Sequence, residues 1–400
     1  VGRPPESPQV VTILVMADHS AEQLERCLDA VLKHTANFCG VVVMTDGSCR
    51  SEIWSEVESY RVRHPAVCGL RHPRSVGWTA TINEGLERAP GDAVVLSSRL
   101  LVTQGWLEKL SACAAGEDCA GASPLIATDQ CERGENIFAL TAPDPERANR
   151  AAALVSERLR PGVPVASRRC LYLRRQALHQ IGRLDQVGCP GVQSLADFGW
   201  RAWSAGIPVL LDDATVLGGL AARDDAGDES GSPREWQQRV QQWIAEDPVA
   251  PLRRSLGDAF VPGARDGLPG ESPPGLLLVV HDGGGGAVCA AEDLAIGLDL
   301  GYRPLLLKTG PRRWTLYQRL RKQLKATRCY TFSEAWKWNP GLDRERSSVL
   351  RLICQEFQVS LVHLHHLLGN GSRLVKELRA NDMPVVFTLH DYYPVCPTAH

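Results

Sequence analysis

Residues 94–110 read VVLSSRLLVTQGWLEKL, and this stretch decides the fold of the first half of the chain. Its apolar start predicts a buried strand, Ser97-Ser98-Arg99 predicts a polar turn, and Gly105-Trp106-Leu107 predicts the start of a helix. Ligands of parallel α/β sheets lie beyond the carboxyl ends of the strands, which is where this turn falls. Because the turn has no carboxylate, the sequence leaves open what it binds and whether it supports chemistry.

Strand and helix patterns alternate on both sides of this stretch. Short apolar runs predict further strands at 10–16, 41–44 and 67–71. Apolar residues at helical spacing predict helices at 21–33 and 79–88. We therefore expect an α/β domain with a mostly parallel sheet over residues 1–222. Asp18, Asp46 and Ser97 would lie at the carboxyl edge of that sheet.

The alternation stops and then restarts in the second half of the chain. Composition predicts a helix and a Gly/Pro-rich linker over residues 223–274. Beyond it, strands are predicted at 276–280, 304–307, 361–364 and 385–389, with a helix at 290–300. Because this set has few strands and no closing helix, we expect residues 275–400 to be an incomplete Rossmann-like α/β domain of a longer protein.

Composition excludes several classes of protein. The chain is 44% hydrophobic and 22% charged, as in globular proteins, and its net charge of -2 disfavours a general nucleic-acid binder. No apolar run approaches the roughly 20 residues that cross a bilayer. The 13 cysteines contain no C-x-x-C pair, which favours reduced thiols. We expect a cytoplasmic protein, with peripheral attachment to the inner membrane face and the oligomeric state left open.

Six segments, in order, resemble the family two glycosyltransferases, which have the GT-A fold and use nucleotide-sugar donors. The segments are VTILVMADHSAEQLERCLDAVL, VVVMTDGSC, SVGWTATINEGLERAPGDAVVL, TQGWLEKL, IGRLDQ and DFGWRAWSAGIPVLLDDATV. They cover about residues 10–217. The resemblance implies a nucleotide-sugar donor and places four residues at the nucleotide: Asp18, Asp46, Asn83 and Ser97.

The metal-binding pattern of that family is absent from this sequence. Such enzymes hold a divalent metal at an Asp-x-Asp turn, which here falls on Ser97-Ser98-Arg99. The acidic motif that supplies their general base falls on Ser194-Leu195 and leaves Asp197. The resemblance therefore implies that the metal-binding and general-base motifs of the family are degenerate here. It also implies that the chain has no recognisable site for a bound cofactor or metal.

Each candidate residue also has a structural interpretation. Arg99 could contact the diphosphate in place of a metal, since a guanidinium suits phosphate oxygens, or it could be a surface residue that fills the place. Asp197 could be a base or the i+4 partner of Arg201. Asp46 could contact the nucleotide or hydrogen-bond to the backbone of its own turn. Asn83 could form a hydrogen bond from its helix to a loop.

From about residue 275 the chain resembles the N-terminal, acceptor-side domain of family four glycosyltransferases, which have the GT-B fold. The segments are VVHDGGGGAVCAAEDLAIGL, VSLVHLHHLLG and VVFTLHDYYPVCP. Gly284, Gly285 and Gly286 would form an anion or acceptor loop at a helix start. His390 is a candidate either for contact with the sugar acceptor or for the role of general base. A zinc site at the histidines of VHLHH is disfavoured, because no further ligand follows at metal spacing.

Together these features favour a glycosyltransferase-type protein that transfers a sugar to a glycan or lipid-linked acceptor during glycan or polysaccharide assembly. Within it, the GT-A domain is either a non-catalytic nucleotide- or glycan-binding scaffold or a metal-independent transferase that uses Arg99 and Asp197. An unrelated nucleotide-binding protein is the third hypothesis.

Overall fold

The chain folds into two compact units, Val1–Gly267 and Leu268–His400. The computed structural model describes residues 11–17, 20–35, 40–48, 51–116, 118–128, 139–142, 144–188, 191–220, 238, 242, 273–298, 301–320, 322–332, 335, 344–366 and 371–390. Apart from residues 238, 242, 273 and 274, the helix and linker expected over 223–274 lie outside the described residues. No helix in the described ranges is long and apolar enough to cross a membrane.

The first unit is built on a sheet of ten strands within its described part. The strands are β1 (Thr12–Met16), β2 (Gly40–Thr45), β3 (Val67–Arg71), β4 (Ala93–Ser97), β5 (Leu100–Leu101), β6 (Gly121–Thr128), β7 (Ala139–Thr141), β8 (Gly162–Val163), β9 (Cys170–Leu173) and β10 (Val209–Gly219). The helices are α1 (Ala21–His34), α2 (Ser51–Arg63), α3 (Trp78–Arg88), α4 (Trp106–Cys113), α5 (Pro145–Val155), α6 (Arg175–Ile181) and α7 (Gln193–Ser204). The strands and helices predicted up to residue 113 are present.

The sheet is mixed, which corrects the expectation of a mostly parallel one. Its main path runs β3-β2-β1-β4-β9-β6-β10-β5, and β3, β2, β1 and β4 are parallel. The strand β9 then runs antiparallel to both of its neighbours, β4 and β6. A buried apolar run has the same pattern in either direction, so the sequence could not reveal that β9 enters the sheet reversed.

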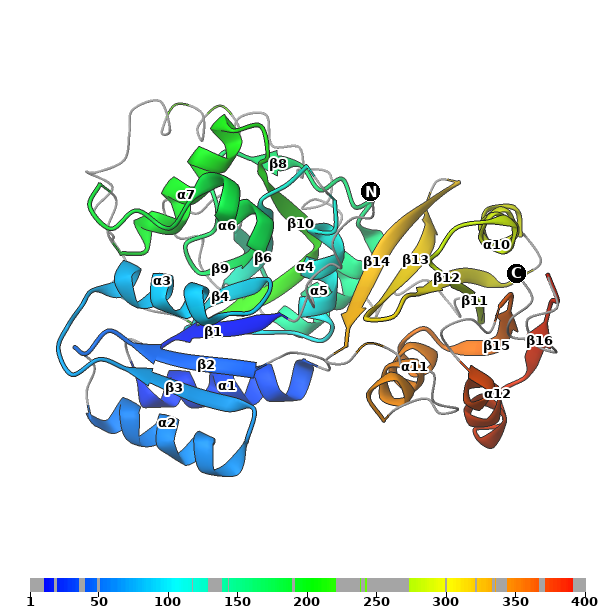
Figure 1. Ribbon diagram of the computed structural model, residues 1–400, viewed down its shortest axis with the longest axis horizontal. Coiled ribbons are helices and arrows are strands. Elements are labelled where there is room, and N and C mark those ends of the chain that lie inside the picture. Colours follow the sequence, from blue (N-terminus) through cyan, green and yellow to red (C-terminus); the bar gives the residue numbers. More distant parts are fainter. Residues whose placement is uncertain are drawn as a thin grey trace. The chain divides into compact units, whose positions relative to one another are not determined.

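Two hydrophobic layers cover the two faces of this sheet. Figure 1 shows α3 on one side of β1, β2 and β3, and α1 and α2 on the other. Successive side chains of a strand point to opposite faces. In β1, Leu14 and Met16 accordingly join the layer made with α3 and α7, whereas Ile13 and Val15 join the layer made with α1, α2 and α4. The carboxyl ends of β1, β2 and β4 are thus held in register by a core on each side.

The second unit has a six-stranded sheet of order β14-β13-β12-β11-β15-β16 in its described part. Its elements are β11 (Gly275–His281), α10 (Gly286–Gly297), β12 (Arg303–Thr309), β13 (Arg313–Leu320), β14 (Gln323–Thr331), α11 (Arg344–Glu356), β15 (Val359–Leu364), α12 (Gly371–Ala380) and β16 (Val385–Phe387). The four predicted strands form its parallel part, β12-β11-β15-β16.

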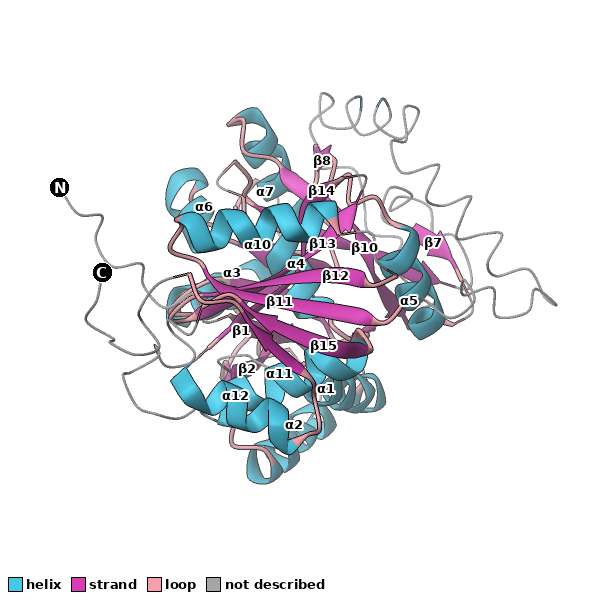
Figure 2. Cartoon of the chain, turned by 90° about the vertical axis from the view of Figure 1, so that its right-hand side faces the viewer, coloured by secondary structure: helices cyan, strands magenta, loops and turns pink. Residues whose placement is uncertain are grey.

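Two features of this unit differ from the sequence prediction. The antiparallel hairpin β13–β14, which extends the sheet beyond β12, was not predicted. The helix α10 begins at Gly286 rather than at residue 290, so that the last of the four glycines is already helical. Figure 2 shows α10 on one side of the sheet and α11 and α12 on the other, in agreement with the two apolar layers of the unit.

Candidate functional site

The carboxyl ends of three parallel strands meet at one edge of the first sheet. Met16 at the end of β1 lies in register with Met44 of β2 and with Ser97 at the end of β4. Asp46 follows β2 directly, so the structure brings Asp46 and Ser97 to the same edge, as the sequence predicted from strand direction. Asp18, the third residue expected there, lies outside the described residues.

Asp46 is the acceptor at the centre of a tight loop. Its Oδ1 accepts hydrogen bonds from the Ser48 amide at 2.8 Å and the Ser48 hydroxyl at 2.6 Å, and its Oδ2 accepts one from the Ser75 hydroxyl at 3.3 Å. Partial burial acts to raise the pKa of Asp46, but the bonds from Ser48 and Ser75 outweigh it and lower the pKa below 3.8. This carboxylate therefore joins the loop after β2 to the segment before α3.

The turn after β4 is fixed by main-chain bonds to three parts of the fold. The Ser97 amide donates to the Arg169 carbonyl at 2.8 Å, and the Ser98 amide donates to the Met16 carbonyl at 3.1 Å. The Leu220 amide, just after β10, donates to the Arg99 carbonyl at 2.8 Å. The turn is thus a rigid part of the sheet edge.

Arg99 is buried at 6% exposure, which corrects the interpretation of this residue as a surface arginine. Its amide donates to the Ser97 hydroxyl at 3.3 Å, and this bond closes the turn. A guanidinium keeps its charge under all ordinary conditions, so the edge of the sheet contains a fixed buried cation.

The residues of this turn do not fit a divalent metal. Mg²⁺ and Mn²⁺ prefer oxygen ligands and in particular carboxylates, whereas the turn offers two hydroxyls beside a guanidinium. A fixed cation at that position repels a second one. In the described ranges no cluster of three or more His, Cys, Asp or Glu side chains could hold a metal ion.

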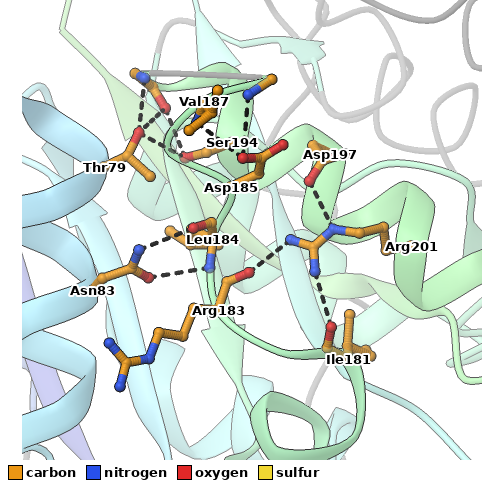
Figure 3. A network of polar contacts seen from close by, with 12 residues as sticks. Thr79, Asn83, Ile181, Arg183, Leu184, Asp185, Val187, Ser194, Asp197 and Arg201 are labelled. Atoms are coloured by element: carbon orange, nitrogen blue, oxygen red, sulfur yellow. Dashed lines mark hydrogen bonds and ion pairs between the residues drawn. The ribbon is translucent and has the colours of Figure 1, made fainter.

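Asp197 forms an ion pair with Arg201 along α7 (Figure 3). The Arg201 Nε donates to Asp197 Oδ2 at 2.7 Å, and the two terminal nitrogens of Arg201 donate to the carbonyls of Ile181 at 3.0 Å and Arg183 at 2.9 Å. The exposed fractions of the two side chains are 15% for Asp197 and 30% for Arg201. Asp197 therefore orients the arginine that holds the segment after α6.

Asn83 holds the same segment from the side of α3 (Figure 3). Its Nδ2 donates to the Leu184 carbonyl at 2.9 Å, and its Oδ1 accepts from the Leu184 amide at 3.1 Å. Thr79, one turn earlier on α3, accepts a hydrogen bond from the Gly191 amide at 2.8 Å and lies 3.4 Å from the Ser194 hydroxyl of α7. Sequence reasoning missed Thr79 and Ser194, because nothing in their spacing indicates that α3 and α7 meet.

The candidate residues of the second unit lie at the carboxyl ends of its parallel strands. Gly284 and Gly285 have φ values of +76° and +96°, which favour glycine, and lead into α10. His390 follows β16, and its Nε2 lies 3.1 Å from His365 Nδ1. His363, in β15, and His365, directly after it, are two residues apart, which is the spacing of side chains on one face of a strand.

Comparison with known proteins gives one family and several similar structures. The glycosyl transferase family 2 model matches residues 12–182. The chain is similar to the crystal structure of GalNAc-T7 with UDP, GalNAc and Mn²⁺, at 16% identity and a TM-score of 0.44, over 60% of this chain and 48% of that one. It is also similar to the mannosyltransferase PcManGT from Pyrobaculum calidifontis in complex with GDP-Man and Mn²⁺, at 16% identity and a TM-score of 0.39, over 63% and 69%. The chain spans about half the length of GalNAc-T7. No curated protein matches it.

Proposed function

We propose that the first unit, whose residues 12–182 form a glycosyl transferase family 2 domain, binds the nucleotide part of a nucleotide sugar without a divalent metal. The protein as a whole acts in sugar transfer during glycan or polysaccharide assembly, on a glycan or lipid-linked acceptor. The metal-free part of the proposal is supported by the turn after β4, which consists of two serines and the buried Arg99 and contains no carboxylate.

A metal-free site needs another way to balance the charge of a diphosphate. Arg99 supplies one fixed positive charge at the edge where β1, β2 and β4 end. The guanidinium is buried, so it contacts a diphosphate only if the site rearranges. Ser97, which is less buried, and the loop of Asp46 provide hydrogen-bonding groups at the same edge.

Within this proposal the first unit binds its nucleotide and does not catalyse transfer. A general base must come within hydrogen-bond reach of the hydroxyl whose proton it takes. Asp197 is instead engaged with Arg201, whose other nitrogens hold two carbonyls, so freeing the carboxylate would also loosen the segment after α6.

A metal-independent transferase is the second candidate function. It is favoured by the presence, on one domain, of a fixed cation at Arg99 and a carboxylate at Asp197. It requires Arg99 to reach the diphosphate and Asp197 to leave Arg201 when the acceptor binds.

The second unit is proposed to be the acceptor-side domain, on the basis of its parallel strands and the glycine loop at α10.

Calorimetric titration of the full chain with UDP, GDP, CDP and dTDP, each with and without Mn²⁺, tests the proposal. We expect one nucleotide to bind with the same affinity in both conditions. Affinity that rises tenfold or more with Mn²⁺ would overturn the metal-free site, and absence of binding to all four would overturn nucleotide binding.

A variant series then separates the two candidate functions. Arg99→Lys keeps the charge in a smaller hydrogen-bonding group, whereas Arg99→Met removes the charge at similar volume, and circular dichroism checks the fold of both. Sugar-nucleotide turnover that is present in the wild type and lost in Asp197→Asn would favour the transferase. Binding without turnover in the wild type supports the binding unit.

A further inference from the structure

Three histidines of the second unit lie together on one face of the sheet. His363 is in register with Leu278 of β11, a residue of the apolar layer under α10, so His363 points to that same face. The rings of His363 and His365 have centroids 4.2 Å apart, which places both on it. In the segment that follows the neighbouring strand β16, Thr388 Oγ1 lies 2.7 Å from His363 Nε2, and His390 Nε2 lies 3.1 Å from His365 Nδ1.

His365 is the buried member of this group. Its side chain is 3% exposed, and its Nε2 is buried with no hydrogen-bond partner among the described residues. The pKa of His365 is lowered to about 4, mainly by burial and further by the neighbouring His363 and His390. His365 is therefore neutral near pH 7 and carries a single ring proton.

The position of that proton decides what the contact with His390 is. If His390 donated from Nε2 to His365 Nδ1, the proton of His365 would lie on its Nε2, as a buried donor with no described partner. If His365 donates from Nδ1, its Nε2 is a bare lone pair instead. Buried N–H groups without a partner are rare in proteins, so we adopt the second arrangement.

We propose that His365 is a positioning residue that donates its Nδ1 hydrogen to His390 Nε2 and thereby fixes neutral His390 with its own proton on Nδ1. His390 is exposed, and its remaining ring nitrogen is then a hydrogen-bond donor. A group recognised there must offer an oxygen or nitrogen lone pair. Neutral His390 cannot take a proton through that nitrogen, so the arrangement assigns it a contact role and not the role of general base.

Ring-nitrogen NMR of the full chain labelled with ¹⁵N-histidine tests this assignment directly. Spectra that correlate ring nitrogens with the carbon-bound ring protons distinguish the two tautomers, and single His→Gln variants assign the 11 histidines. At pH 7.5 we expect both His365 and His390 to carry the proton on Nδ1. A proton on Nε2 of His365, or on Nε2 of His390, would overturn the proposal.

Two substitutions separate positioning from packing. In His365→Asn the amide nitrogen takes the place of Nδ1–H, so His390 should keep its Nδ1 tautomer. In His365→Phe the ring shape is retained without the donor, and His390 should shift toward the Nε2 tautomer that free histidine prefers. An unchanged His390 tautomer in the Phe variant, with the His363 ring signals preserved, would contradict a positioning role.

Discussion

Asp197 and Arg201 are joined by a 2.7 Å ion pair across one turn of α7, and the arginine carries that pairing into the main chain after α6. The carboxylate that the sequence offered as a candidate base is therefore also a structural partner.

The Asp197 to Arg201 pair should show energetic coupling. Both side chains are at most 30% exposed, so we expect a double-mutant cycle with Asp197→Asn and Arg201→Gln to give a coupling energy of about 1 kcal/mol. Arg201→Gln should lower the free energy of unfolding by about 1 kcal/mol more than Asp197→Asn, because it also removes two hydrogen bonds to carbonyls. Urea unfolding measures all four proteins, and additive effects would contradict the coupling.

Asn83 should contribute to stability through its two bonds to Leu184. The side chain is 3% exposed, so Asn83→Ala leaves a buried amide and a buried carbonyl without their partner. We expect a loss of about 2–3 kcal/mol in unfolding free energy. Ser55→Ala, which removes a bond on the exposed side of α2, is the control and should change stability by less than about 0.5 kcal/mol. Equal effects of the two substitutions would refute the role of Asn83.

The loop of Asp46 should depend on glycine at position 47 for space as well as for conformation. Gly47 has a φ of +91°, and a Cβ there would come within 2.3 Å of the Arg74 carbonyl oxygen. Gly77 has a φ of +87° but no atom within 4 Å of its Cβ position, so it is a matched control. Gly77, with ψ of 153°, lies in a backbone region that is essentially restricted to glycine, so we expect Gly77→Ala to lower the free energy of unfolding by about 1–3 kcal/mol. Gly47→Ala should lower it by about 1–3 kcal/mol more, from overpacking. The midpoints of thermal unfolding rank the two, and the reverse order would contradict this account.

The stability of the second unit should fall in mild acid. Burial, with the neighbouring His363 and His390, lowers the pKa of His365 from 6.5 to about 4, so between these values the unfolded chain binds a proton that the folded unit does not. The contribution of neutral His365 is full above pH 6.5 and is lost as the pH falls toward 4, by up to about 1.4 kcal/mol per pH unit.

Unfolding of the wild type and of His365→Asn at pH 7.5, 6 and 5 measures this effect. All other titrating groups are common to both proteins, so the difference between them isolates His365. We expect the variant to lose less stability than the wild type between pH 7.5 and 5. Identical pH dependence would show that His365 is not protonated on unfolding in this range.

The sequence by itself determined much of the local structure. Apolar runs and helical spacing located β1–β4, α1, α3 and α4 but not α2 or β5, and they located the four parallel strands of the second unit, because a buried regular element has apolar residues at a regular spacing. Strand direction then placed Asp46 and Ser97 at one edge, and the sequence alone shows that the turn Ser97-Ser98-Arg99 contains no carboxylate.

Only the tertiary structure decided how the candidate residues are used. It reversed β9 within the sheet, buried Arg99, joined Asn83 to Leu184 across 101 positions and brought together His365 and His390, which follow two different strands. These outcomes depend on which distant surfaces meet, and a short sequence pattern contains no record of its partner. The residue types within one segment can therefore be read from the sequence. The contacts that decide whether a side chain is buried, which tautomer it adopts and which groups it can touch depend on the packed fold.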